Sequence, residues 1–328
     1  MKRILGILGI LVAVMVVTGI LQPAFLSGYN LSNVTQLSAY FAILSIGVMF
    51  VIITGGIDLS IGPVVGLVGC LLPLLIVKYG FHPALAIAFV MGVAALIGTT
   101  HGLLITKAKL QPFVVTLCGW LIYRGLARWI TGDANQGFGN SFNGLLEISR
   151  KKIPLPGDYQ VPIPVVYMLI IAVLAAIFLN KTVWGRYLYA IGRNEQAAHF
   201  SGINTDRIKL MAYVLCSTIA GFGGVLLAFD LNSMQPSSHG NTYELYAIAA
   251  AVLGGCSLRG GEGSVAGVVI GAVLLRVLYS ANNMLGIPST LEYVTIGTVL
   301  LAGVLADEGV KWYSQRRKLI QSAKKVAA

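Results

Sequence analysis

The chain has 328 residues, of which 56% are hydrophobic and only 11% are charged. Soluble domains carry about 25% charged residues, so this chain cannot cover a soluble globule of its size with charge. The composition excludes a disordered protein, a secreted disulfide scaffold and a nucleic-acid-binding module, and it predicts an all-α, polytopic membrane helix bundle. The net charge of +11 fits this class, since Lys and Arg gather in the cytoplasmic loops of membrane proteins.

Ten apolar segments are interpreted as candidate membrane spans. Most approach the roughly 20 residues that a helix needs to cross the hydrocarbon core. The first follows a Lys-Arg pair and has no small-x-small cleavage site after it, which predicts an uncleaved span and not a signal peptide. The segments are residues 4–21, 37–54, 63–77, 84–106, 112–131, 163–180, 208–229, 243–253, 265–281 and 290–306.

Two of the ten segments, 63–77 and 243–253, are short and lie beside glycine-rich polar stretches. These stretches read GGIDLS at 55–60 and GGCSLRGG at 254–261. Irregular backbone cannot face lipid, because its N–H and C=O groups would lose their hydrogen bonds. We therefore expect both breaks to be buried in protein or to line a water-filled cavity, and such breaks are the best sequence indicator of a transport path.

The first break has two interpretations. Ser60 is predicted to cap a helix that starts directly after it, with Pro63 in the first turn. Asp58 would then lie beside the positive end of the helix dipole, as a satisfied capping carboxylate. Alternatively, Asp58 forms with Gly55, Gly56 and Ser60 a polar lining or gate of the path, since ionisable residues at membrane depth are functional candidates.

Arg124 interrupts the apolar segment 112–131, about two-thirds of the way across at ~1.5 Å per residue. Its side chain can extend toward the membrane surface or pair with a carboxylate such as Glu244 or Glu292. We favour a structural pair over a substrate contact, and we retain Arg124 as a candidate for the path.

The polar segment 181–207 contains a predicted short helix. Asn194 is a good N-cap, Glu195 falls in the first turn, and Gly202 can end the helix in a left-handed conformation. The segment is either an ordinary polar loop or a docking element for another protein. The candidate docking residues are Gly192, Arg193, Asn194, Glu195, Ala197, Ala198 and Gly202.

The basic residues predict the orientation. With the N-terminus in the cytoplasm, sixteen of the 23 Lys and Arg residues fall in inner segments and four in outer ones, as the positive-inside rule expects. Both termini are then cytoplasmic. The chain divides into a transmembrane domain at 1–310 and a basic cytoplasmic tail at 311–328.

No catalytic or metal site is predicted. The four cysteines have no CxxC spacing and no nearby His, so we expect small core residues and no metal. The sequence contains no GxxxxGK[ST], G-x-S-x-G or H-E-x-x-H motif. We therefore expect a protein that is not an enzyme and holds no cofactor of its own.

Four blocks of sequence together resemble the membrane permease of bacterial ATP-binding cassette importers for monosaccharides, the ribose/xylose/galactose type. Any one block is weak, but their order and combination are specific and cover nearly the whole chain. The blocks are residues 52–62, 112–117 with 123–127, 189–198 with 201–203, and 244–255 with 260–265.

The resemblance implies a multi-pass permease subunit of the bacterial inner membrane, in contact with membrane lipid. It would pair with a second copy or a related permease and form the path for a monosaccharide. A periplasmic or lipid-anchored sugar-binding protein would dock outside, and ATPase subunits that bind the ATP would dock inside on a coupling helix at 192–203. No nucleic-acid partner is expected.

The alternative is a stand-alone ion-coupled secondary transporter of a small polar solute. Such proteins place carboxylates or His within their spans as proton relays, whereas Asp58 and Glu292 are predicted near span ends. A membrane enzyme or receptor would need a catalytic or ligand-binding soluble part, which this sequence lacks.

Overall fold

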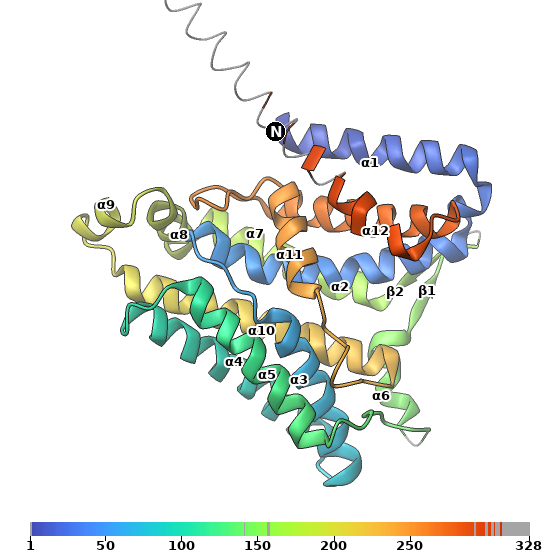
Figure 1. Cartoon of the computed structure of the whole chain (residues 1–328), viewed down its shortest axis with the longest axis horizontal. Helices are drawn as coiled ribbons and strands as arrows, with labels where there is room; N and C mark the ends of the chain where they lie inside the picture. Colours follow the sequence, from blue (N-terminus) through green and yellow to red (C-terminus); the bar gives the residue numbers. More distant parts are fainter. Residues whose placement is uncertain are drawn as a thin grey trace, which may run out of the picture.

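Helices make up most of the protein in the computed structural model, which describes residues 2–140, 142–155, 158–291 and 293–298, and residues 301, 302, 305 and 309. Within these residues, seven helical segments are long and apolar enough to cross a membrane. The predicted all-α membrane bundle is therefore confirmed (Figure 1). In chain order the elements are α1 (Lys2–Leu21), η1 (Pro23–Leu26), α2 (Gly28–Ile53), α3 (Ile61–Pro73), η2 (Leu74–Lys78), α4 (Pro83–Thr106), α5 (Pro112–Thr131), α6 (Asn143–Arg150), β1 (Lys152–Pro154), β2 (Gln160–Pro162), α7 (Ile163–Lys181), α8 (Val183–Arg193), α9 (Glu195–Phe200), α10 (Thr205–Leu231), α11 (Tyr243–Leu253), α12 (Val265–Met284) and η3 (Ser289–Leu291).

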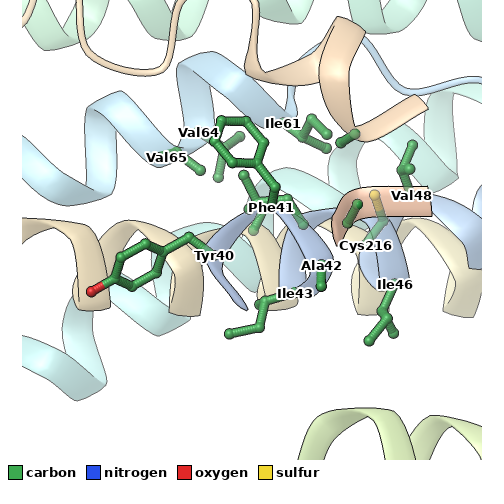
Figure 2. Packing of buried hydrophobic residues seen from close by; sticks show 14 of the residues in the cluster. Tyr40, Phe41, Ala42, Ile43, Ile46, Val48, Ile61, Val64, Val65 and Cys216 are labelled. Carbon is green, nitrogen blue, oxygen red and sulfur yellow. The ribbon is translucent and has the colours of Figure 1, made fainter. Parts of the chain in front are cut away.

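The centre of the bundle is formed by α2 and α10. Residues 38–53 of α2 are all buried, as expected for a helix that is apolar around its whole circumference. Figure 2 shows Phe41 and Ile43 leaving α2 on opposite sides, so both sides are packed. α10 also packs closely on α4, where a Cβ added to Gly98 would lie only 2.5 Å from the carbonyl oxygen of Tyr213. Small residues at such positions let membrane helices approach closely.

α3 begins directly after the break, at Ile61, with Pro63 in its first turn. The prediction of a short segment at 63–77 was wrong. Pro73 has no N–H to give, and the helix widens there into the π-type turn η2, which extends it to Lys78. The combined segment of 18 residues is long enough to cross a membrane. α11, in contrast, is short and has the predicted bounds 243–253.

The long segment 132–162, which lies between two of the predicted spans, contains α6 and a small antiparallel hairpin of β1 and β2. The hairpin pairs Lys152 with Pro162 and Pro154 with Gln160. The Gln160 N–H donates to Ser32 Oγ of α2 at 3.0 Å. Figure 1 shows the hairpin and α6 at one end of the bundle and α8 with α9 at the other.

The last predicted span, 290–306, is described only in part, as η3 and a helical stretch at 293–298. Glu292 and the predicted basic tail at 311–328 lie outside the described residues. The division into a transmembrane domain at 1–310 and a tail therefore stays a prediction.

Candidate functional site

The predicted docking helix is present as α9, capped at both ends. The Ala197 N–H donates to the Asn194 side-chain oxygen at 2.9 Å, which makes Asn194 the N-cap. Gly202 follows the helix at φ +83°, and the Ile203 N–H donates to the Ala198 carbonyl at 3.1 Å. The sequence-based prediction of both caps is confirmed.

The sequence interpretation missed α8, which precedes α9 as a second helix. Thr182 caps it by accepting a hydrogen bond from the Gly185 N–H at 3.1 Å. Gly185, Leu188 and Ile191 are its buried residues. The spacing of three residues between these buried positions could have predicted the helix. Tyrosines and glycines at neighbouring positions made this period hard to recognise in the sequence.

α9 turns most of its side chains outward. Ala198 is buried and anchors the helix, whereas Glu195, Ala197 and Phe200 are exposed. Phe200 is 87% exposed. A surface hollow of about 870 Å³ lies between α9 and the turn that joins α4 to α5. An exposed aromatic side chain beside a hollow is suited to contact with another protein.

Ion pairs fix the position of this region. Lys209 Nζ lies 2.5 Å from a carboxylate oxygen of Glu195, which joins α10 to α9. Lys107 and Lys109 each place Nζ 3.1 Å from Asp206, which joins the α4–α5 turn to the start of α10. Exposed pairs contribute about 0–1 kcal/mol each to stability, so their main effect is to orient the segments.

Three segments of the chain meet at Gly192, near the end of α8. The Gly261 N–H donates to the Ile53 carbonyl at 2.8 Å, which joins the 254–264 loop to the end of α2. A Cβ added to Gly192 would lie 1.9 Å from that carbonyl oxygen and 2.2 Å from the Gly261 nitrogen. The Tyr189 hydroxyl also donates to the Gly263 carbonyl at 2.9 Å. The docking segment is thus packed directly on the two broken regions, and we call this contact the glycine junction.

Asp58 is fully buried at the start of α3. Its Oδ1 accepts from the Ser60 N–H at 2.9 Å and from the Ser60 hydroxyl at 2.7 Å. Ser60 itself makes no capping bond, so the expectation that Ser60 caps α3 was wrong. A carboxylate is a stronger acceptor than a hydroxyl, so Asp58 accepts the backbone hydrogen bond at the start of α3 in place of Ser60. Gly55 has φ +78°, and a Cβ on Gly56 would lie 2.6 Å from the Tyr213 hydroxyl. Both glycines are therefore needed for the backbone to adopt the conformation of the break between α2 and α3.

Arg124 is buried and binds backbone. Its Nη1 donates to the carbonyls of Pro236 and His239 at 2.8 and 2.7 Å. Glu244, one of the two expected partners, instead accepts from the Trp120 indole at 3.1 Å. The Arg124 side chain therefore holds the segment between α10 and α11 in place, which favours the structural interpretation. The roles of Asp58 and Arg124 in a path stay predictions.

A second polar group lies around Arg276, which, like Arg124, interrupts an apolar run of the sequence. On α12, the guanidinium carbon of Arg276 lies 4.3 Å from the centre of the Tyr279 ring and 5.3 Å from that of Phe41 on α2. The ring centres of Tyr243 and Tyr246 of α11 lie 5.0 and 5.8 Å from that of Phe41. The available signal was an Arg within an apolar run followed by Tyr three residues later, which places both on one helix face.

The sequence comparisons agree with this architecture. Residues 30–304 match the family described as branched-chain amino acid transport system / permease component. The chain is 39% identical to the ribose import permease protein RbsC of Bacillus subtilis (strain 168), over 94% of this chain and 93% of that protein. It is 37% identical to RbsC of Escherichia coli (strain K12), over 90% and 91%, and 32% identical to the xylose transport system permease protein XylH of that strain, over 88% and 87%.

No solved structure matches the chain significantly. The family match covers most of the sequence, and the described residues supply several membrane-spanning helices. The chain is thus a multi-pass membrane protein that belongs to the permease-component family of branched-chain amino acid transport systems.

Proposed function

We propose that the chain is the permease subunit of a bacterial ATP-binding cassette importer for a monosaccharide. The observation that carries the proposal is the end-to-end similarity to the ribose import permease of Bacillus subtilis, at 39% identity. The family description names branched-chain amino acids, but the relatives described above are named for ribose and xylose. Similarity over about nine-tenths of both chains favours a sugar.

ATPase subunits would bind the ATP and dock on α9, so the permease itself has no need of a cofactor. Three observations support this docking surface: the exposed Phe200, the adjoining hollow, and the ion pairs that hold α9 to α10. The glycine junction then passes a displacement of α9 to the end of α2 and to the 254–264 loop. ATP can shift the conformational equilibrium of the permease only if the docked ATPase binds one conformation of the permease more tightly than the other.

The sugar-binding protein would dock at the opposite end, where α6 and the hairpin lie (Figure 1). Arg150, Lys151 and Lys152 give this end a basic surface. These three residues are among the four basic residues that the proposed orientation, with both termini cytoplasmic, leaves outside against sixteen inside. A second copy or a related permease would complete the path between the two membrane subunits.

The test is transport by purified components in liposomes. The chain, its cognate ATPase and its cognate binding protein are reconstituted, and uptake of radiolabelled ribose, xylose and leucine is measured with ATP on the ATPase side. We expect accumulation of a pentose that needs both ATP and the binding protein. Accumulation of leucine alone would overturn the sugar assignment.

A second arm tests the alternative of an ion-coupled transporter. The chain alone is placed in liposomes with an imposed proton gradient and no ATP. We expect no accumulation of any of the three solutes. Gradient-driven uptake by the chain alone would contradict the ATP-driven proposal.

A further inference from the structure

An irregular segment, residues 232–242, joins the end of α10 to the start of α11 (Figure 1). All but three of its residues carry a hydroxyl, amide or imidazole side chain, and we call the segment the polar strap. The three other residues are Met234, Pro236 and Gly240, and all three are buried. The strap therefore packs on the protein through its few non-polar residues.

The strap lies along α3, on a face formed by three glycines. A Cβ added to Gly66 would lie 2.8 Å from the His239 carbonyl oxygen. A Cβ on Gly62 would overlap the Gly240 carbonyl, and one on Gly69 would overlap the end of the Met234 side chain. These glycines are spaced by four and three residues, so they share one side of α3. The close approach fixes which part of the strap lies at which level of the helix.

The middle of the strap is at membrane depth by two independent counts. Gly66, which contacts His239, lies about 18 Å from Lys78 at the end of the α3–η2 segment, at ~1.5 Å per residue. Arg124 donates to the same His239 carbonyl and lies about 18 Å from the start of α5 at Pro112. Both lengths place His239 near the centre of a hydrocarbon core of about 30 Å.

The strap turns polar side chains away from α3 at this depth. Four of them are exposed in the single chain, namely Ser233, Gln235, Ser238 and Asn241. Some local bonds order them: the Ser238 hydroxyl donates to the Gln235 side-chain oxygen at 2.9 Å, and the Asn241 amide donates to the Ser237 carbonyl at 3.1 Å. A side-chain amide has two N–H donors and an acceptor oxygen, so Gln235 and Asn241 can each form further hydrogen bonds.

These exposed groups cannot face lipid. Irregular backbone and polar side chains at membrane depth are tolerated only where they are buried in protein or line a water-filled cavity. Contact with a second permease would bury them, but serine is depleted in interfaces between proteins. A row of hydroxyl and amide groups is better suited to water and to a solute that carries many hydroxyls.

We propose that the polar strap lines the path along which the monosaccharide crosses the membrane. The inference rests on the proposed sugar-import function and assigns a wall of its path to residues 233–241. The amide and hydroxyl groups of the strap exchange hydrogen bonds with the sugar in place of water. Arg124 positions this wall from behind, through its bonds to the Pro236 and His239 carbonyls. A wall of single weak contacts suits a path, because a transported solute must also leave.

The first experiment measures water access in the assembled importer. Cys118 is exposed and the other three cysteines are buried, so Cys118→Ala provides the background. Ser238→Cys and Asn241→Cys are compared with Leu174→Cys on α7, an apolar position that is 61% exposed. We expect a charged methanethiosulfonate to label the two strap positions at least about tenfold faster, since only they would face water. Labelling no faster than at Leu174→Cys would show that lipid or a second permease covers the strap, and would overturn the proposal.

The second experiment asks whether the water at the strap is the sugar path. Ser238→Cys is reacted to completion with either a methyl or a sulfonatoethyl methanethiosulfonate, and ATP-driven sugar uptake is measured. We expect the large adduct to lower uptake at least about tenfold and the methyl adduct to lower it less, because only the large one obstructs the path. ATPase activity stimulated by the binding protein should stay within about twofold of the unlabelled protein. Undiminished uptake after complete labelling, or a parallel fall of uptake and ATPase activity, would overturn the assignment.

The third experiment removes one hydrogen-bonding group. Gln235→Met keeps the length of the side chain and replaces the amide by a thioether. We expect uptake to fall by about two- to tenfold, the effect of one net hydrogen bond, while melting in detergent is unchanged because the side chain is exposed. Wild-type uptake would show that the Gln235 amide makes no contact with the sugar and would remove it from the wall of the path.

These outcomes are distinct from failure of the proposed function. If the wild-type importer moves no monosaccharide, the proposed function fails whatever the labelling shows. If the wild type imports a sugar and the strap is inaccessible, or is labelled without effect on uptake, only the path assignment fails.

Discussion

Replacement of Gly192 by alanine tests the glycine junction directly. The new Cβ would lie 1.9 Å from the Ile53 carbonyl oxygen and 2.2 Å from the Gly261 nitrogen, and these two atoms are joined by a 2.8 Å hydrogen bond. Both neighbours are backbone, so neither can rotate away. Loss of a buried hydrogen bond costs about 1–3 kcal/mol, and overpacking costs about 1–3 kcal/mol more. We therefore expect Gly192→Ala to disfavour the packed junction by about 2–6 kcal/mol.

The assay is ATP-driven sugar uptake, with the amount of protein in the membrane measured in parallel. A cost of 2 kcal/mol at the junction corresponds to a fall of about thirtyfold in the population of the packed state, since each ~1.4 kcal/mol is a factor of ten. We expect uptake to fall by at least tenfold while the membrane level is preserved, because the helices themselves are unaltered. The matched control is Gly92→Ala on α4, where a Cβ meets no atom within 4 Å. Wild-type uptake in Gly192→Ala would refute the coupling role of the junction.

Three further predictions concern the same machinery. Glu195→Lys places a second cation beside Lys209, so we expect uptake to be lost at an unchanged membrane level, with Glu195→Gln retaining more activity; equal activity of both would argue against the ion pair. Asp58→Ala removes the acceptor for both Ser60 donors and should lower thermal stability in detergent by about 0.5–2 kcal/mol more than Asp58→Asn, and identical melting of the two would exclude the capping role. Phe200→Ala removes an exposed ring and should leave melting unchanged while weakening co-purification of the ATPase, whereas undiminished co-purification would place the docking contact elsewhere.

Features that depend on local sequence were predictable. The bounds of α11 and the two caps of α9 follow from residues within one helical turn, namely glycines at the helix ends and the Asn194 side chain. α8 was missed because its buried stripe of Gly185, Leu188 and Ile191 is short and interrupted by tyrosines. The hairpin was missed because strands of three residues rich in proline carry almost no period of two.

Features that depend on contacts between distant segments were not predictable. The sequence placed Asp58 and Ser60 together, but only the fold shows that the carboxylate is the acceptor and the hydroxyl the donor. Arg124 was expected to find a carboxylate, and it found two carbonyls more than 110 positions away, because the segment between α10 and α11 folds back over α3. The contacts of Phe41 likewise join α2 to Tyr243 of α11 and Arg276 of α12, which no spacing rule connects.

α2 runs without interruption for 26 residues, which is about 39 Å. One end carries Ser32, bonded to the hairpin, and the other ends at the Ile53 carbonyl that joins the 254–264 loop. A single helix therefore links the two faces of the membrane on which unlike partners would dock. If both partners bias the position of α2, their binding affinities are coupled reciprocally. The factor by which the binding protein changes the affinity for nucleotide must then equal the factor by which nucleotide changes the affinity for the binding protein.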